Sequence, residues 1–165
     1  MLENVILIAG GTLTALLAGL FADFSAAVVP ALRSLPAQQH LLAMQAINVK
    51  IKNPVFLLMF LGPSILLPLA AWLHQGTTAF PLLASAAALH IIGGNGITIL
   101  GNVPLNDRLE ALDLRQYSET DAERVRQEYH GPGARWVRLH DLRTLAVVGA
   151  AALAFAACLA KGASD

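Results

Sequence analysis

The sequence predicts an all-α integral membrane protein, a bundle of four membrane-spanning helices with short amphipathic helices in its cytoplasmic loops. Hydrophobic residues make up 56% of the 165 residues and charged residues only 13%, whereas about a quarter of the residues in a soluble domain are charged. The charges are also segregated. Seven of the eleven Lys and Arg residues, and eight of the eleven Asp and Glu residues, lie between Asp107 and Arg143. The rest of the chain consists mainly of four apolar runs, which is the pattern of a multi-pass membrane protein.

Each apolar run is close to the ~20 residues that a helix needs to cross a hydrocarbon core ~30 Å thick. We predict membrane spans at about residues 5–32, 55–73, 80–103 and 142–160. The first run lacks a basic segment and continues past any plausible cleavage site, so we interpret it as a retained helix and not as a signal peptide. A polar loop at 104–141 separates the last two spans, and we expect residues 1–165 to form a single membrane domain.

The distribution of basic residues predicts the orientation of the spans. Ten Lys and Arg residues lie in the connections after the first and third spans, and only Lys161 follows the fourth. Because basic loops remain in the cytoplasm, we expect both long loops to be cytoplasmic and both termini to lie outside. The predicted location is the inner or plasma membrane, crossed up-down-up-down.

Both long loops are predicted to contain a helix. Apolar residues recur at nearly helical spacing over residues 41–51, which predicts an amphipathic helix at the membrane interface that ends before Pro54. Ser118 and Asp121 form a Ser-x-x-Asp capping pattern, which predicts a second helix that stops at the Gly-Pro-Gly of residues 131–133. The simplest role for this charged helix is a solvated spacer.

Polar side chains inside the predicted spans are candidate functional residues, because each one costs free energy in a bilayer. Counting ~1.5 Å per residue places Asp23 of the first span and Asn95 of the third at similar depth, where they could face each other. His90 lies more than a turn deeper and could reach Asp23 through a water molecule. A hydrogen-bonded, purely structural carboxyl is the alternative for Asp23.

A second polar group comes from four segments that the topology places together near the cytoplasmic surface. It consists of Gln45, Asn48, Asn53, Asn102, Asn106, Trp136, His140, Asp141 and Arg143. We expect these residues to form the rim or floor of a pocket between the helices. His140, beside Asp141, is a candidate general base, with an ordinary surface histidine as the alternative.

Two structural roles for members of this group stay open as alternatives. Asn102 and Asn106 could do no more than cap a helix end and satisfy backbone groups. Arg143 could extend toward the interface and pair with Asp141 or Asp107.

Several classes of function have no support in the sequence. Cys158 is the only cysteine, so no intrachain disulfide can form, and the five scattered histidines show no zinc spacing. The net charge is zero and no basic stripe alternates with aromatic residues, so nucleic-acid binding is not expected. We predict neither a metal nor another cofactor.

Four motifs together resemble the family of small four-span membrane proteins that includes the fungal anthrone oxygenases. They are AGLFADFSAAVVPAL at residues 18–32, MQAINVKIKNP at 44–54, NVPLN at 102–106 and RWVRLHDLRT at 135–144. The resemblance covers nearly the whole chain. Three residues depart from the family pattern: His140 replaces a usual Asn, Leu139 a common second Trp, and Asp23 a small or aromatic residue.

The resemblance implies oxidation of an anthrone to an anthraquinone by dioxygen, without an evident metal or flavin. Such a site needs a base, donors that hold the developing enolate and an apolar pocket that excludes water. The implied bases are His140 and Asp23. The implied substrate-binding residues are Asn48, Asn53, Asn95, Asn102, Asn106, Arg143 and His90, with Trp136, Phe24 and Phe56 covering the rings.

Two functions therefore stay open. The first is a cofactor-independent oxygenase, or a related oxidoreductase, that acts on a polycyclic phenol or a quinone-like lipid. The second is a non-catalytic membrane module that binds a lipid or another hydrophobic molecule, or that supports a partner membrane protein. The expected partners are the lipid bilayer, a hydrophobic aromatic or quinone-like small molecule and, as an open alternative, a second copy of the chain.

Overall fold

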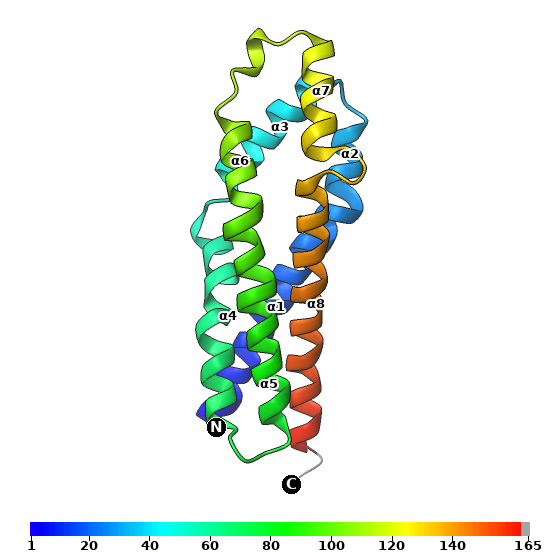
Figure 1. Cartoon of the computed structure of the whole chain (residues 1–165). Coiled ribbons are helices and arrows are strands. Elements are labelled where there is room, and N and C mark those ends of the chain that lie inside the picture. The colour runs from blue at the N-terminus through cyan, green and yellow to red at the C-terminus, as the bar shows by residue number, and fades with distance from the viewer. Residues whose placement is uncertain (163–165) are drawn as a thin grey trace.

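A computed structural model describes residues 1–162, which fold entirely into helices and connecting turns, with no strand in this part of the chain. Four helices are long and apolar enough to cross a membrane. The predicted fold class is therefore confirmed: the protein is a membrane four-helix bundle. The start of α1 (Leu2–Asp23) and the end of α8 (Arg135–Gly162) lie at one end of the bundle, as Figure 1 shows.

The four long helices are described here in chain order. The first is α1 (Leu2–Asp23), the π-helical turn η1 (Phe24–Val28) and α2 (Val29–Arg33). The second is α4 (Pro54–Leu73). The third is α5 (Ala79–Ala88), the π-helical segments η2 (Leu89–Gly96) and η3 (Thr98–Asn102), and α6 (Val103–Glu110). The fourth long helix is α8 (Arg135–Gly162). The π-helical segments were not predicted from the sequence; such segments are rare and frequently occur at functional sites.

We call the end of the bundle opposite the start of α1 the loop end (Figure 1). It carries the remaining elements, which are α3 (Ala37–Lys50), the 3₁₀ turn η4 (Leu114–Gln116) and α7 (Glu119–His130). Both predicted loop helices are thus present. The hydroxyl of Ser118 accepts a hydrogen bond from the backbone N–H of Asp121 at 3.1 Å, so α7 begins at the predicted cap. The helix ends before Gly131, as the Gly-Pro-Gly pattern predicts.

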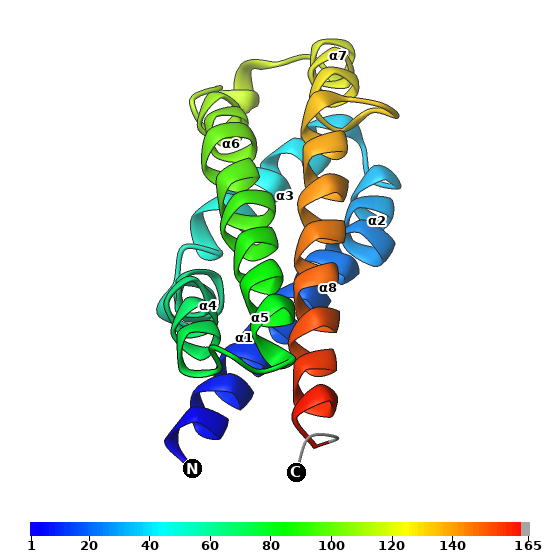
Figure 2. The same ribbon diagram turned by 60° about the horizontal axis from the view of Figure 1, so that its bottom comes forward.

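Each long helix packs against two neighbours around the bundle. Helix α1 contacts α4 and α8, and the third helix packs between α4 and α8 on the other side (Figure 2). The interior is filled by buried Leu, Val and Ala side chains. Large apolar side chains such as Ile65, Ile92 and Leu145 are exposed on the outside of the bundle. So much exposed apolar surface is suited to lipid and not to water.

The third helix approaches α8 closely at two glycines. A Cβ atom on Gly94 would lie 2.7 Å from Cγ2 of Val147, and one on Gly93 would collide with Cβ of Ala146. Without a hydrophobic driving force between helices in lipid, small residues allow the close contact that holds helices together. Gly93 and Gly94 therefore serve close helix packing, whereas Gly19 has open space around it.

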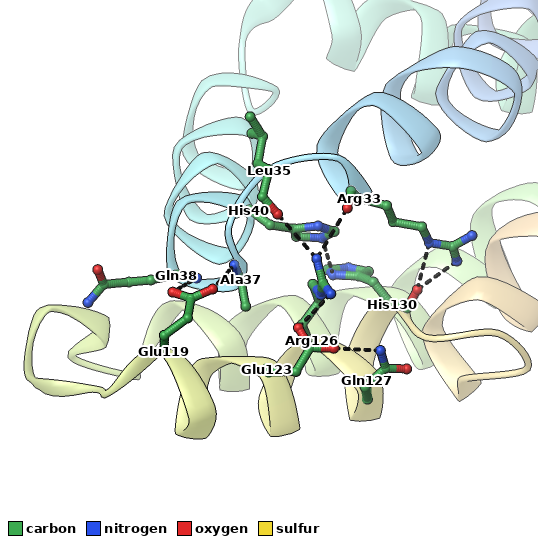
Figure 3. A network of polar contacts seen from close by, with 10 residues as sticks. All are labelled: Arg33, Leu35, Ala37, Gln38, His40, Glu119, Glu123, Arg126, Gln127 and His130. Atoms are coloured by element: carbon green, nitrogen blue, oxygen red, sulfur yellow. Dashed lines mark hydrogen bonds and ion pairs between the residues drawn. The ribbon is translucent and has the colours of Figure 1, made fainter.

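Helix α7 is docked on the rest of the loop end, so the interpretation as a solvated spacer is wrong (Figure 3). The carboxylate of Glu119 accepts hydrogen bonds from the first backbone N–H groups of α3, at Ala37 and Gln38. A carboxylate at this position caps α3 and interacts favourably with its dipole. At the other end of α7, the guanidinium of Arg33 donates to the carbonyl of His130 at 2.6 Å. The guanidinium of Arg126 donates to the carbonyl groups of Arg33, the last residue of α2, and of Leu35 in the following turn.

Two buried histidines form the centre of this contact. The rings of His40 and His130 stack with centroids 5.1 Å apart, and Nε2 of His40 lies 3.2 Å from Nδ1 of His130 (Figure 3). Burial lowers the pKa of His40 below its ordinary value of 6.5, and the neighbouring cations Arg126 and Arg33 lower it further. The backbone carbonyl of Leu32 and the carboxylate of Glu123 act on this pKa in the opposite direction. The docked state therefore favours a neutral His40.

We expect acidification to loosen α7. The folded pKa of His40 lies below the unfolded one, so the stabilisation is complete above about pH 6.5 and is lost as the pH falls toward the folded pKa. Amide hydrogen exchange in α7 should be faster at pH 5 than at pH 7.5, after correction for intrinsic rates. His40→Gln should reduce this difference. An equal difference in wild type and variant would contradict the assignment to His40.

Candidate functional site

A pocket with a volume of about 780 Å³, counted out to its mouth, lies at the loop end and is bordered by all four long helices and α3. Its apolar lining consists of Leu20, Phe21, Phe24, Met44, Ile47, Ile51, Phe56 and Val103. The remaining lining residues carry polar groups, including the indole of Trp136; they are Asn48, Lys52, Thr98, Asn106, Asp107, Trp136, His140 and Arg143. A mostly apolar pocket of this size with a few convergent polar groups is typical of a small-molecule site.

Seven of the twelve residues predicted for the site line this pocket. They are Phe24, Asn48, Phe56, Asn106, Trp136, His140 and Arg143. They come from five separate elements and are brought together only by the fold. The structure thus contains the expected pocket near the loop end.

The deeper polar pair lies elsewhere and has a different set of contacts. Nε2 of His90 donates to the carbonyl oxygen of Phe60 at 3.0 Å, and Nδ2 of Asn95 donates to the same oxygen at 3.1 Å. Asn95 also donates to the hydroxyl of Ser64 at 2.8 Å. These bonds tie the third helix to α4 within the bundle, and neither residue lines the pocket.

The other three predicted residues also lie outside the pocket lining. Asp23 is exposed on the outside of the first helix, so it does not face Asn95 as expected. Asn53 caps α4, with its side-chain oxygen accepting from the N–H of Phe56 at 3.0 Å. Asn102 is fully buried and donates to the carbonyl of Trp136 at 3.1 Å.

Trp136 is held in place by the two asparagines of the NVPLN motif. Its indole N–H donates to Oδ1 of Asn106 at 2.7 Å, while its carbonyl accepts from Asn102. The prolyl ring of this motif lies in the first turn of α6, where a missing N–H costs little. The two amides therefore join the third helix to the start of α8, which goes beyond the capping role considered as an alternative.

Arg143 is a buried cation without a carboxylate partner among the described residues. It is only 9% exposed, and its guanidinium lies 4.2 Å from the ring centroid of Phe21, which favours a cation–π interaction. Nη1 donates to the hydroxyl of Thr98 at 3.0 Å, and Nε and Nη2 donate to Nδ1 of His140 at 3.1 and 2.8 Å. The prediction that Arg143 pairs with Asp141 or Asp107 is wrong.

Two N–H groups of Arg143 have no protein partner in these contacts. A guanidinium carries five N–H donors, of which three are used by Thr98 and His140. One N–H remains on each terminal nitrogen. Burying a charge without a counter-ion is costly, so the arrangement favours a negatively charged or strongly polarised oxygen in the pocket.

Asn48 supplies a further donor without an acceptor. Its Nδ2 atom is buried and makes no hydrogen bond to the described part of the chain, and the residue is 6% exposed. Unsatisfied buried donors are uncommon and cost about 1–3 kcal/mol. Asn48 and Arg143 thus both present unpaired N–H groups in a pocket whose other walls are largely aromatic and aliphatic.

His140 has both ring nitrogens in use. Nε2 lies 3.2 Å from the carbonyl oxygen of Phe21, which can only accept, so this nitrogen carries the proton. Nδ1 then accepts the hydrogen bonds from Arg143. The ring also stacks on Trp136, with centroids 4.9 Å apart. Asp141, expected to orient His140, instead accepts from Ser25 on the exposed side of α8.

Nine lining residues were not predicted for the site, and among them are Phe21, Lys52, Thr98 and Asp107. Thr98 and Phe21 have no sequence signal of their own, because threonine and phenylalanine are ordinary in a membrane helix. Asp107 could have been found, since it directly follows the NVPLN motif and, among the described residues, is the only one that lines the pocket with a carboxylate.

A sequence profile described as anthrone oxygenase matches residues 44–153. The chain belongs to the anthrone oxygenase family. The matched segment runs from Met44 on α3 to Leu153 on α8, so it includes Asn48, Asp107 and Arg143 of the pocket but not the first helix. No curated protein and no solved structure matches the chain.

Proposed function

We propose that the chain is an anthrone-oxygenase-like membrane oxidoreductase whose pocket takes up a planar, weakly acidic polycyclic phenol and promotes its oxidation by dioxygen. The observation that carries the proposal is the buried Arg143 without a carboxylate partner, which lies in an aromatic pocket. Membership of the family supports the same function. The wider membrane oxidoreductase class, acting on a quinone-like lipid, would use the same pocket.

The proposed chemistry needs the pocket to stabilise an anion. An electron-rich enolate can pass electrons to dioxygen, and the difficult step is to form that enolate near neutral pH. Donors that are already aligned toward the developing oxyanion lower this barrier because they need no reorganisation. Arg143 and Asn48 provide such donors, while Phe24, Phe56 and Trp136 provide flat apolar surfaces for the rings.

The membrane gives this site a suitable setting. A polycyclic phenol partitions into lipid, and the pocket lies at the loop end, where the third helix and α3 meet the polar connections. We place this end in the cytoplasm because ten basic residues lie in its loops and one lies after the fourth span. A substrate could then enter from the cytoplasmic leaflet.

The purified protein in detergent should convert anthrone to anthraquinone, with one dioxygen consumed per anthrone. We expect Leu20→Trp to abolish most of this turnover because the larger ring fills the pocket. Leu16→Trp is the matched control: Leu16 lies one turn earlier on α1, is 54% exposed and does not line the pocket. The rate of anthraquinone formation, followed by absorbance, measures both effects.

Three outcomes of this experiment are informative. Equal turnover in Leu20→Trp and wild type would contradict the proposed site. No turnover by wild type above the rate in empty micelles would contradict the proposed activity. If such an inactive protein still bound a dihydroxyanthraquinone, and Leu20→Trp did not, the non-catalytic binding module would be the better assignment.

A further inference from the structure

Proton removal from the substrate requires an atom in the pocket that is free to accept a proton. His140 is not free. Its only lone pair, on Nδ1, receives two hydrogen bonds from Arg143, and Nε2 already carries a proton that is donated to Phe21. A second proton on Nδ1 would replace these hydrogen bonds by repulsion between two adjacent cations. Nδ1 therefore holds Arg143 in place, and neither ring nitrogen is free for a ligand.

Asp107 is the remaining candidate among the pocket residues. Among the described residues it supplies the only carboxylate of the lining, and no hydrogen bond or ion pair joins that carboxylate to another residue. The other charge at the mouth, Lys52, pairs with Glu110 on the same helix as Asp107, with Nζ 3.4 Å from the carboxylate. The pocket thus contains one unpaired buried cation, Arg143, and one unpaired exposed carboxylate.

The two unpaired charges lie at different depths of the same pocket. Arg143 is bound to Thr98, which precedes Asp107 by nine residues on the third helix, at most about 13 Å along its axis. The oxygen and the acidic methylene group of an anthrone lie at opposite edges of its central ring. A site for this molecule therefore needs its oxyanion donors and its base on opposite sides of the ring.

We propose that Asp107 is the proton acceptor of the pocket and that His140 is a positioning residue for Arg143. This inference rests on the proposed function. A C–H bond of the methylene group breaks, the proton moves to the Asp107 carboxylate, and the electron pair moves through the ring to the oxygen held by Arg143 and Asn48. Dioxygen then adds at the same carbon and takes the electrons. The resulting peroxide receives the proton, and loss of water leaves the new carbonyl group.

Anaerobic hydrogen–deuterium exchange tests the proton transfer separately from the oxygen chemistry. Wild type in deuterated buffer without dioxygen should accelerate exchange of the anthrone methylene protons above the rate in empty micelles, as measured by mass spectrometry. Asp107→Asn should lower this acceleration by ~10²-fold, the lower end of what a positioned base contributes. Asp107→Glu should restore part of it.

A matched control and a binding measurement separate a catalytic role from a structural one. Asp113→Asn alters an exposed carboxylate in the same connection that does not line the pocket, so exchange should remain at the wild-type rate. Asp107→Asn should still bind a dihydroxyanthraquinone as wild type does. Wild-type exchange by Asp107→Asn would overturn the inference and leave the proposed function in place. A wild-type protein that neither exchanges nor oxidises anthrone would overturn both.

His140 is tested by a conservative and a non-conservative change. The side-chain oxygen of Gln can accept from Arg143 but cannot act as a base, so His140→Gln should retain most of the anaerobic exchange. His140→Leu should instead weaken the red shift that a dihydroxyanthraquinone shows when the pocket stabilises its ionised form. Loss of exchange in His140→Gln to the level of Asp107→Asn would identify His140 as the base and overturn the assignment.

Discussion

Arg143→Met should oxidise anthrone about 10²–10³-fold more slowly than wild type, because it removes the principal donor to the developing oxyanion. The fold should tolerate this change. Methionine fills a similar space, and the substitution removes a buried charge that has no carboxylate partner among the described residues. Initial rates of anthraquinone formation give the first effect, and thermal unfolding in detergent should give an unchanged or higher midpoint.

A second arginine on α8 provides the control for this prediction. Arg138 is exposed and does not line the pocket, so Arg138→Met should keep the wild-type rate. Arg143→Lys should be intermediate, since it retains a charge but loses the planar fork that contacts Thr98 and His140. A wild-type rate in Arg143→Met would show that the pocket does not use this cation.

Gly93→Ala should destabilise the bundle by about 3 kcal/mol, at the upper end of the range for an overpacked contact. The added methyl group would collide with Cβ of Ala146 on α8, so one helix must move away from the other. The free energy of unfolding, measured by titration with a denaturing detergent, reports this loss. Turnover should fall as well, since the same two helices hold Thr98 against Arg143 at 3.0 Å.

Gly19→Ala is the matched substitution for this measurement. Gly19 also lies in a long helix, but a Cβ there would meet nothing within 4 Å. Alanine is a better helix former than glycine by ~1 kcal/mol, so stability should stay the same or rise. Equal destabilisation of both variants would mean that flexibility of glycine, and not close packing, explains the requirement at Gly93.

The sequence alone determined the architecture of this protein. Long apolar runs cannot remain in water, and a backbone in lipid must form all of its hydrogen bonds internally, so the runs had to be helices. The two ends of α7 could also be predicted, since Ser118 caps its start and the Gly-Pro-Gly segment that begins at Gly131 ends it. The polar motifs also identified Asn48, Asn106, His140 and Arg143 of the pocket, because amides and charges so close to a membrane span are rarely without a partner.

Only the tertiary structure decided which of these polar residues belong together. Residue counting places Asp23 and Asn95 at a similar depth and His90 more than a turn deeper, yet the π-helical turns rotate successive side chains by an amount that a regular helical period does not predict. The hydrogen-bond partners of Arg143 could not be predicted from the sequence either. Arg138 and Asp141 are the charged residues nearest to Arg143 in the sequence, but its donors point to His140, one turn earlier on α8, and to Thr98 on the third helix. Hydrogen bonding depends on the direction and distance of atoms from separate helices, which spacing along one chain does not fix.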